Sequence, residues 1–595
     1  MSGNRRSFLK TVSGAAMATA LARRGAAAAG TRIEPFDYEG VRLLDGPAKR
    51  QYAATRDFYY NLPNDDVLKG FRERAGHAHP GESLGGWCRR NSNVVFGQWL
   101  SGMARMSKAT GDAEIGEKAA YLMREWGKTI SSDGNAGLGH YTYDKAMCGL
   151  VDLYLYNDRK DALSLMEKIT GWAIKNLDRE RTLAKLLEPQ STNLEWYTLS
   201  ENLYRAYQAT GNEKYKSFGD VWRYEDYWNQ LAGGKRTKSY IVHGYSHVNS
   251  FSGAAMTYAV TGDARYLRIL KNAYDFLQET QCFATGGYGP FERLVPPDGT
   301  LGETLQRYCD SFETPCGSWA GFKMSRYLMS FTGESRYGDW MEQLYYNGIG
   351  AALPMTGRGR TFYYADYRIG AGNKLYFLEA FPCCSGTYAQ DVADYHNIIY
   401  FKDAAGLYVN LFLPSELTWK RDGVDVTLTQ KTSYPEAETV DLSLDMREEC
   451  EFALRIRVPG WARGFSIQVN GGESGAEIRP GEWATLRRRW KNGDRVEIRI
   501  PDRFQFQPVD EQHPNRVAIR RGAVVLVQDG WFTEEARDLP PENEITGWLT
   551  PHKEEPGVFE SKDREGKFLK TGRFLPFYQM PEQRPYRMYL DRTES

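Results

Sequence analysis

A short phrase, Thr-Gly followed by an acidic or amide residue, occurs four times in this 595-residue sequence, beginning at Thr110, Thr210, Thr261 and Thr332. Each copy follows an apolar stretch with helical periodicity, and three copies lead into a tyrosine at the same offset. Glycine commonly ends a helix in the left-handed conformation, and Asp or Asn commonly caps the next helix. The phrase therefore predicts a series of helical hairpins, with two helices meeting at each copy.

The spacing of the copies decides how these hairpins are arranged. They begin 100, 51 and 71 residues apart, whereas a solenoid protein has a fixed period. Unequal spacing favours hairpins of variable length in a closed ring, an (α/α)6 barrel or toroid, with a helical solenoid as the alternative. One buried helix face is visible at Trp99, Leu100, Met103 and Met106, which are apolar residues at helical spacing.

Near residue 400 the pattern changes from helical to strand-like. Short β-rich segments are separated by turn signals such as Asn470-Gly471-Gly472. The segments lie at 407–412, 441–444, 453–458, 465–469, 495–500, 520–530 and 573–590. We expect a barrel domain over residues 31–400, followed over residues 401–595 by one or two β-sandwich domains whose final strands pack back.

The first thirty residues read as a targeting segment. Residues 5–10, Arg-Arg-Ser-Phe-Leu-Lys, precede a weakly apolar stretch rich in alanine and a run of small residues at 26–29. This pattern resembles a bacterial twin-arginine signal peptide over residues 1–30. We expect a periplasmic or extracellular protein that folds before export, so that its thiols can meet a metal in the reducing cytoplasm.

Charge and composition exclude several classes of protein. The sequence has 76 basic and 76 acidic residues, so it has no net charge that would attract nucleic acid. It contains no run of 18 or more strongly apolar residues that would span a membrane. Eight cysteines are too few for a disulfide scaffold, and an aromatic content of 13% suits a sugar-binding cleft and a large helical core equally well.

Three of the eight cysteines lie in two short motifs. Cys316 ends the motif Glu-Thr-Pro-Cys that begins at Glu313, and Cys383 and Cys384 are adjacent. Adjacent cysteines rarely form a disulfide with each other, because their Cβ vectors diverge. Three thiols and a carboxylate match the preference of zinc for four sulfur, nitrogen or oxygen ligands. Three unrelated buried thiols are the alternative on spacing alone.

The Glu-Thr-Pro-Cys motif, followed about seventy residues later by the Cys-Cys pair, resembles the β-L-arabinofuranosidase family, glycoside hydrolase family 127 and its relatives. Further matching phrases extend the resemblance over nearly the whole mature chain. They are Gly85-Gly86-Trp87, Gly139-His140, Gly286-Gly287-Tyr288-Gly289, Val458-Pro459-Gly460-Trp461-Ala462 and Leu575-Pro576-Phe577-Tyr578.

The resemblance implies a retaining exo-glycoside hydrolase that acts on the oligo- or polysaccharides of plant or algal glycans, with Zn²⁺ as its cofactor. The implied zinc ligands are Glu313, Cys316, Cys383 and Cys384. Cys383 would also be the nucleophile, because metal coordination removes the thiol proton and leaves a thiolate at neutral pH.

The resemblance further implies a glutamate acid/base and sugar-contacting histidines. Glu292, which follows the Gly-Gly-Tyr-Gly phrase, is favoured as the acid/base, and Glu303 is its rival. His140 matches a histidine that contacts the sugar, with a structural role as the alternative. His247 resembles a second such histidine less closely.

Two departures from the family pattern bear on function. The spacing from Glu313 to Cys316 is one residue longer than expected, and residues 193–197, Asn-Leu-Glu-Trp-Tyr, lack the histidine expected of a third sugar contact. Changed polar residues in a sugar site predict a changed specificity. Two other functions stay open: a toroid polysaccharide lyase, which needs basic residues near its cleft, and a non-catalytic glycan-binding protein with a structural zinc.

Overall fold

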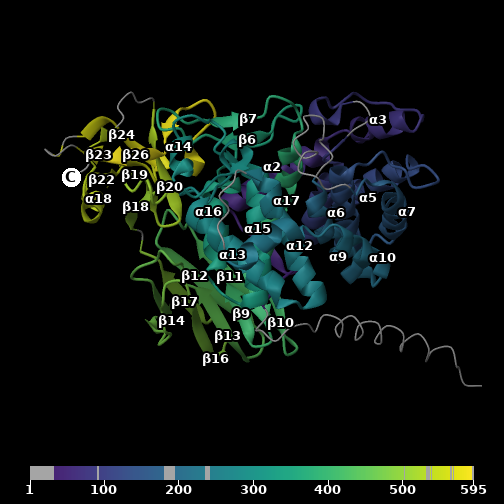
Figure 1. The fold of residues 1–595 in the computed structure, drawn as a ribbon. Helices are drawn as coiled ribbons and strands as arrows, with labels where there is room; N and C mark the ends of the chain where they lie inside the picture. Colours follow the sequence, from purple (N-terminus) through teal and green to yellow (C-terminus); the bar gives the residue numbers. More distant parts are fainter. Residues whose placement is uncertain are drawn as a thin grey trace, which may run out of the picture.

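The computed structural model describes residues 33–89, 93–179, 195–234, 241–501, 503–530, 536–537, 539–562, 566 and 568–592. The predicted signal peptide, residues 1–30, lies outside these residues. No helix in the described part of the chain is long and apolar enough to cross a membrane. Helices dominate the chain up to Ile398, and strands dominate it from Tyr400 onward (Figure 1).

Among the described residues, six helices form a closed inner ring. Each contacts the next in chain order, and the last returns to the first. The ring consists of α4 (Phe96–Thr110), α6 (His140–Asn157), α9 (Leu199–Thr210), α12 (Gly244–Thr261), α15 (Thr314–Thr332) and α17 (Cys383–Ile398). This arrangement confirms the predicted (α/α)6 barrel.

Each inner helix also packs against an outer helix. In the order of the ring, these partners are α5 (Ala113–Lys128), α7 (Asp161–Asn176), α10 (Glu213–Val221), α13 (Ala264–Thr280), α16 (Tyr337–Asn347) and α2 (Pro47–Asn61). Further helices lie outside this scheme: α3 (Asn64–Arg74), α11 (Glu225–Ala232), α14 (Thr300–Thr304) and α18 (Ile545–Trp548). The paired helices make the hairpins that the Thr-Gly phrase predicts.

The Thr-Gly phrase marks the end of four inner helices. A glycine in the left-handed conformation follows each of them, at Gly111, Gly211, Gly262 and Gly333. The next side chain caps the outer helix at three of the copies, with Asp112, Asn212 and Asp263. The capping prediction is wrong for Glu334, because α16 begins only at Tyr337 and the carboxylate pairs instead with Lys271 and Arg336.

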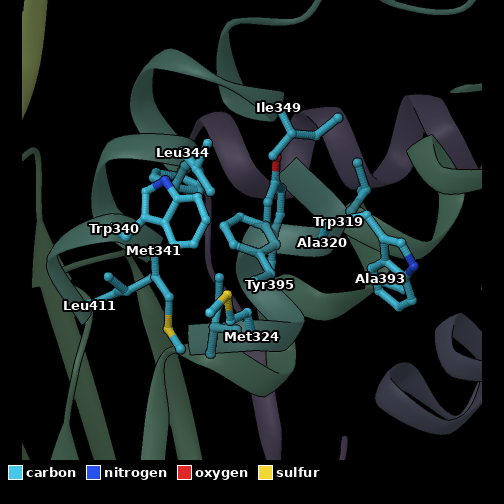
Figure 2. Packing of buried hydrophobic residues seen from close by; sticks show 14 of the residues in the cluster. Trp319, Ala320, Met324, Trp340, Met341, Leu344, Ile349, Ala393, Tyr395 and Leu411 are labelled. Carbon is cyan, nitrogen blue, oxygen red and sulfur yellow. The ribbon is translucent and has the colours of Figure 1, made fainter. Parts of the chain in front are cut away.

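Large apolar side chains fill the space between the ring and its outer helices. Figure 2 shows one such region, where Trp340 and Met341 of α16 lie beside Met324 of α15 and Tyr395 of α17. All four side chains are fully buried, and every residue of α17 is buried. A helix enclosed on all sides has no solvent-facing polar stripe, so its polar groups need partners inside the protein.

A network of buried ion pairs joins five inner helices of the described chain near their C-terminal ends. Arg105 of α4 lies 2.7 Å from Asp152 of α6 and 3.0 Å from Asp394 of α17. Arg326 of α15 also pairs with Asp394, at 2.7 Å, and Arg205 of α9 pairs with Asp152. Because both aspartates are fully buried, each depends on these arginines for its charge balance.

Two sheets form a β-sandwich in the described chain. The five-stranded sheet contains β1 (Glu34–Pro35), β8 (Tyr400–Asp403), β9 (Gly406–Val409), β13 (Cys450–Arg457) and β16 (Trp483–Trp490). The seven-stranded sheet contains β15 (Gly472–Glu473), β14 (Ser466–Val469), β17 (Arg495–Arg499), β12 (Thr439–Met446), β11 (Val424–Thr432), β10 (Ser415–Arg421) and β2 (Val41–Leu43). Trp419 and Phe452 pack edge to face between the sheets, which is how two inner faces share a core.

A nine-stranded sheet follows the sandwich. Its strands are β18 (Phe504–Pro508), β19 (Arg516–Arg521), β20 (Val524–Asp529), β21 (Ala536–Arg537), β22 (Leu549–Pro551), β23 (Phe559–Lys562), β24 (Phe568–Pro576), β25 (Tyr586–Arg587) and β26 (Tyr589–Arg592). The last of them, β26, returns to pair with β19, and the Tyr589 hydroxyl accepts a hydrogen bond from the Ala284 backbone of the barrel domain. The end of the chain is thereby held against the helical ring.

The first described strands belong to the sandwich, although they precede the barrel in the sequence. In the registers of β1 with β8 and of β2 with β10, Glu34 lies opposite Lys402 and Val41 lies opposite Leu417. The sandwich is also joined to the barrel by the Trp483 indole, which donates to the Gly333 carbonyl at 2.7 Å. The chain therefore enters the barrel from two strands of the sandwich, and a hydrogen bond also joins the two domains.

We expect Arg105→Met to lower the free energy of unfolding by about 3–5 kcal/mol, because it leaves two buried aspartates without a shared counter-charge. Arg42→Met is the matched control, since Arg42 is 63% exposed in its pair with Glu416 and an exposed pair contributes at most about 1 kcal/mol. Chemical denaturation followed by tryptophan fluorescence measures both. Equal losses in the two variants would contradict the stabilising role of the network.

Candidate active site

The N-termini of several inner helices converge at one end of the barrel and carry polar side chains there. Cys383 is the first residue of α17, Glu313 is the N-cap of α15 and His243 is the N-cap of α12. Glu195 precedes the short 3-10 helix η2 (Trp196–Thr198) that leads into α9. Because a helix N-terminus carries partial positive charge, this end of the ring favours thiolates and carboxylates.

Glu313, Cys316, Cys383 and Cys384 form a compact group, here called the thiol cluster. One ligand atom from each lies within 4.8 Å of the others, and all four residues are buried. Glu313 Oε1 is 3.2 Å from the Cys383 Sγ and 3.5 Å from the Cys384 Sγ, and the sulfurs of Cys384 and Cys316 are 3.4 Å apart. The structure therefore brings together all four predicted metal ligands.

The longer spacing between Glu313 and Cys316 is accommodated by the start of α15. Thr314 and Pro315 form the first turn of the helix, where a proline needs no hydrogen-bond donor. This turn presents the Glu313 carboxylate and the Cys316 thiol on the same side, toward Cys383 and Cys384. The carboxylate thus reaches the cluster despite the additional residue.

The donor set of the thiol cluster fits a zinc ion. Three thiol sulfurs and one carboxylate give four ligands of the types that zinc binds, in a buried site. The second oxygen of Glu313 is buried and has no hydrogen-bond partner among the described residues. Burial and the nearby Cys383 raise the pKa of Glu313 to about 7, because both disfavour a charged carboxylate.

Glu292 lies close to Cys383, and one tyrosine hydroxyl connects them. The Tyr363 hydroxyl donates to Glu292 Oε1 at 3.3 Å and lies 3.2 Å from the Cys383 Sγ. The hydroxyl of the adjacent Tyr364 also donates to Glu292 Oε1. Both tyrosines lie on β6 (Phe362–Ala365), which pairs with β5 (Phe312–Glu313) and so places them beside the cluster.

Protonation in this region departs from ordinary values in opposite directions. Burial, with a smaller contribution from Glu313, raises the pKa of Glu292. Burial also acts to raise the pKa of Cys383, but hydrogen bonds from Cys316, Cys384 and Tyr363 outweigh it and hold that pKa well below its usual value. The arrangement therefore favours a protonated carboxylic acid beside a thiolate.

Glu292 and His243 occupy matching positions at the end of a small two-stranded sheet. β3 (Ile241–Val242) pairs with β4 (Arg293–Leu294), so His243 directly follows one strand and Glu292 directly precedes the other. Both residues have a positive φ, 57° and 52°. Non-glycine residues adopt this conformation at a cost of about 1–3 kcal/mol, and such residues are concentrated at functional sites.

The other predicted site residues lie outside the thiol cluster, although the His247 Nδ1 bonds to the His243 carbonyl beside it. The His140 Nε2 donates to the Asp178 carbonyl at 2.6 Å. His247 contacts the rings of Tyr197, Tyr224 and Tyr227, and neither histidine has a described contact with the thiol cluster. Glu303 is exposed and lines a separate surface cavity with Phe291 and Arg307.

Four further residues of the site were not predicted. Tyr363 and Tyr364 contact Glu292, and Glu195 and His243 form a pair whose Nδ1 and Oε1 atoms are 2.6 Å apart. A signal existed for Glu195 alone, because it lies in the segment that lacks an expected histidine. The other three are recognisable only once β3, β4, β5 and β6 are assembled.

Comparison with known proteins places this geometry in a family. The model of the GH127 β-L-arabinofuranosidase catalytic domain matches residues 40–397, and the model of the GH127 middle domain matches residues 406–502. No curated protein matches the chain.

Solved structures share the fold at low sequence identity. A GH127 β-L-arabinofuranosidase from Geobacillus stearothermophilus T6 aligns with a TM-score of 0.69 and 19% identity, over 93% of this chain and 100% of that one. Another GH127 β-arabinofuranosidase aligns with a TM-score of 0.72 and 17% identity, over 95% of this chain and 98% of the other. Because the two family models together cover most of the sequence, the chain belongs to the GH127 β-L-arabinofuranosidase family and is a glycoside hydrolase.

Proposed function

We propose that this protein is a retaining exo-glycosidase in which Cys383 is the nucleophile and Glu292 is the acid/base. The observation that carries the proposal is the Tyr363 hydroxyl, which lies 3.3 Å from Glu292 Oε1 and 3.2 Å from the Cys383 Sγ. A half-buried carboxylic acid of raised pKa and a thiol of lowered pKa thus lie on either side of one hydroxyl. These are the two groups that a double-displacement hydrolysis requires.

The separation of the two groups supports retention of configuration. Since both contact one hydroxyl, the Glu292 oxygen and the Cys383 sulfur are at most about 6.5 Å apart, at or below the lower limit for inverting glycosidases. Inverting enzymes need a wider gap, because a water molecule must fit between the base and the sugar. A shorter gap leaves room for direct attack by the sulfur on the anomeric carbon.

In the proposed mechanism, Glu313, Cys316, Cys383 and Cys384 would hold a zinc ion, whose coordination would keep the Cys383 thiol deprotonated at neutral pH. Cys383 attacks the anomeric carbon while Glu292 donates its proton to the leaving oxygen, which gives a thioglycosyl enzyme. Glu292 then takes a proton from water, and that water displaces the cysteine sulfur and releases the sugar.

The substrate we propose is the non-reducing end of a neutral plant or algal glycan, with a β-L-arabinofuranoside as the first candidate. The carboxylates of Glu195 and Glu313 lie at or beside the thiol cluster, and their charges would disfavour a uronate. Two cations close to the cluster are already paired, Lys145 with Asp144 and His243 with Glu195. This charge distribution gives no support to a polysaccharide lyase, which must neutralise its substrate's carboxylate.

We further propose that the protein is exported by the twin-arginine route to the periplasm or the cell exterior. The support is the Arg5-Arg6 motif and the small residues near position 28. Export of an already folded protein allows the thiol cluster to take up its metal before it meets an oxidising compartment.

We expect protein purified without chelators to contain about one equivalent of zinc, measured by elemental analysis, because the thiol cluster supplies a complete ligand set. Removal of the metal with a chelator should abolish turnover, and added zinc should restore it. A content below half an equivalent would contradict a zinc thiolate site.

We expect Glu292→Ala to lower turnover of an aryl β-L-arabinofuranoside by a factor of about 10²–10⁴, with partial rescue by azide, an anionic nucleophile that displaces the cysteine sulfur in the second step without a general base and gives a glycosyl azide. Glu303→Ala is the control, because Glu303 is exposed in a separate cavity. Rates with and without azide separate the two carboxylates. Rescue confined to Glu303→Ala would assign the acid/base to Glu303.

We expect Tyr364→Phe to move the basic limb of the kcat/KM profile to higher pH by about one unit. Tyr364 donates to the Glu292 carboxylate and so lowers its pKa; without this hydrogen bond that pKa rises, and the acid keeps its proton to a higher pH. Tyr376→Phe is the control, because Tyr376 lies on the strand next to β6 and its hydroxyl donates to the Pro354 carbonyl. An unchanged basic limb in Tyr364→Phe would argue against Glu292 as the titrating acid.

A further inference from the structure

Glu195 and His243 form a half-buried pair directly beside the thiol cluster. The His243 Nδ1 lies 2.6 Å from Glu195 Oε1, and its Nε2 lies 3.6 Å from Glu313 Oε2. A carboxylate oxygen accepts the Nδ1 proton, so this contact fixes the orientation of the ring. The three side chains therefore form a chain from carboxylate to imidazole to carboxylate.

The two oxygens of Glu313 face different neighbours. Oε1 lies toward the sulfurs of Cys383 and Cys384, at 3.2 and 3.5 Å, whereas Oε2 lies toward the imidazole of His243. Oε2 makes no hydrogen bond in the described chain, and His243 is the basic group within 4.0 Å of it there. The imidazole is thus placed to attract Oε2 and to leave Oε1 turned toward the thiols.

The protein holds His243 in place from its backbone as well as from its ring. Its carbonyl accepts hydrogen bonds from the Ser246 and His247 amides, from the Ser246 hydroxyl at 3.0 Å and from the His247 Nδ1 at 3.2 Å. These contacts retain the residue at a φ of 57°, in the left-handed region. The Tyr197 hydroxyl, 2.7 Å from the Ser246 Oγ, further ties the segment after Glu195 to α12.

We propose that Glu195 is a positioning residue, which acts through His243 to hold the Glu313 carboxylate with one oxygen turned toward the thiols as a metal ligand. This inference rests on the proposed zinc site and extends it outward by two residues. Glu195 itself is 12% exposed and does not contact the thiols, whereas outer partners of metal ligands commonly set ligand orientation and affinity.

The test measures zinc affinity by competition with a chromophoric chelator in the full-length protein. We expect the zinc dissociation constant to rise about tenfold or more in Glu195→Ala and His243→Ala, and less in Glu195→Gln, which keeps the shape and one acceptor oxygen. The double variant Glu195→Ala/His243→Ala should be no weaker than His243→Ala alone, because the two residues act in series. Glu416→Ala removes a carboxylate from β10 of the sandwich and is the control for effects of losing any carboxylate.

Cobalt substitution gives a second readout that does not depend on turnover. The visible absorption bands of the cobalt protein report ligand geometry, and we expect them to shift in Glu195→Gln and His243→Gln, whose side chains preserve volume for folding. In kinetics, a positioning role lowers kcat with little change in KM, whereas direct sugar binding by His243 would mainly raise KM.

The outcomes separate the two proposals. Wild-type zinc binding with unchanged affinity and spectra in the variants would overturn the positioning role alone. Additive losses in the double variant, or a change confined to KM, would also overturn it. A wild-type protein that binds no zinc would overturn the proposed function together with this inference.

Discussion

The structure depends on the closure of the inner ring, in which α17 returns to pack against α4. Closure brings the first turns of α12, α15 and α17 to one end of the barrel, although α12 begins at Gly244 and α17 only at Cys383. Side chains at the first turns of these helices then meet over the ring axis, as Glu313, Cys383 and His243 do. Helix N-termini also favour the negative charge that a thiolate and a carboxylate carry. One packing event therefore supplies both the geometry and part of the electrostatics of the site.

Buried charges are balanced at one end of the ring and not at the other. Toward the C-terminal ends, Arg105 and its partners form complete ion pairs that fix neighbouring helices against each other. At the N-terminal end the carboxylates outnumber their cations, and Glu313 retains an oxygen without a hydrogen-bond partner. Balanced charges stabilise a fold, whereas unbalanced ones are available to bind a metal ion or to transfer protons.

The sequence alone predicts what is local or periodic. The Thr-Gly phrase predicts the hairpins because glycine at a helix end has a local conformational cause. Its capping prediction fails at Glu334, where α16 begins only at Tyr337 and the carboxylate pairs with Lys271 and Arg336. Cys316, Cys383 and Cys384 were identified as a group through a family resemblance and the ligand preference of zinc. The Glu195 and His243 pair, and the Tyr363 bridge, arise from contacts between distant strands and helices that no spacing pattern encodes. The sugar contacts of His140 and His247 stay predictions; within the protein, the structure pairs these side chains with the Asp178 carbonyl and the Tyr224 hydroxyl.

The pairing of β1 with β8 and of β2 with β10 has a consequence for the order of synthesis. β1 has no strand partner until the ribosome has made the segment up to Lys402, and β2 has none until Leu417 has been made; α17, which closes the ring, also emerges late. The helical hairpins can form as they leave the ribosome, but the ring stays open and its apolar inner faces stay exposed until then. Long-range contacts of this kind slow folding and prolong the time during which the nascent chain needs protection by chaperones.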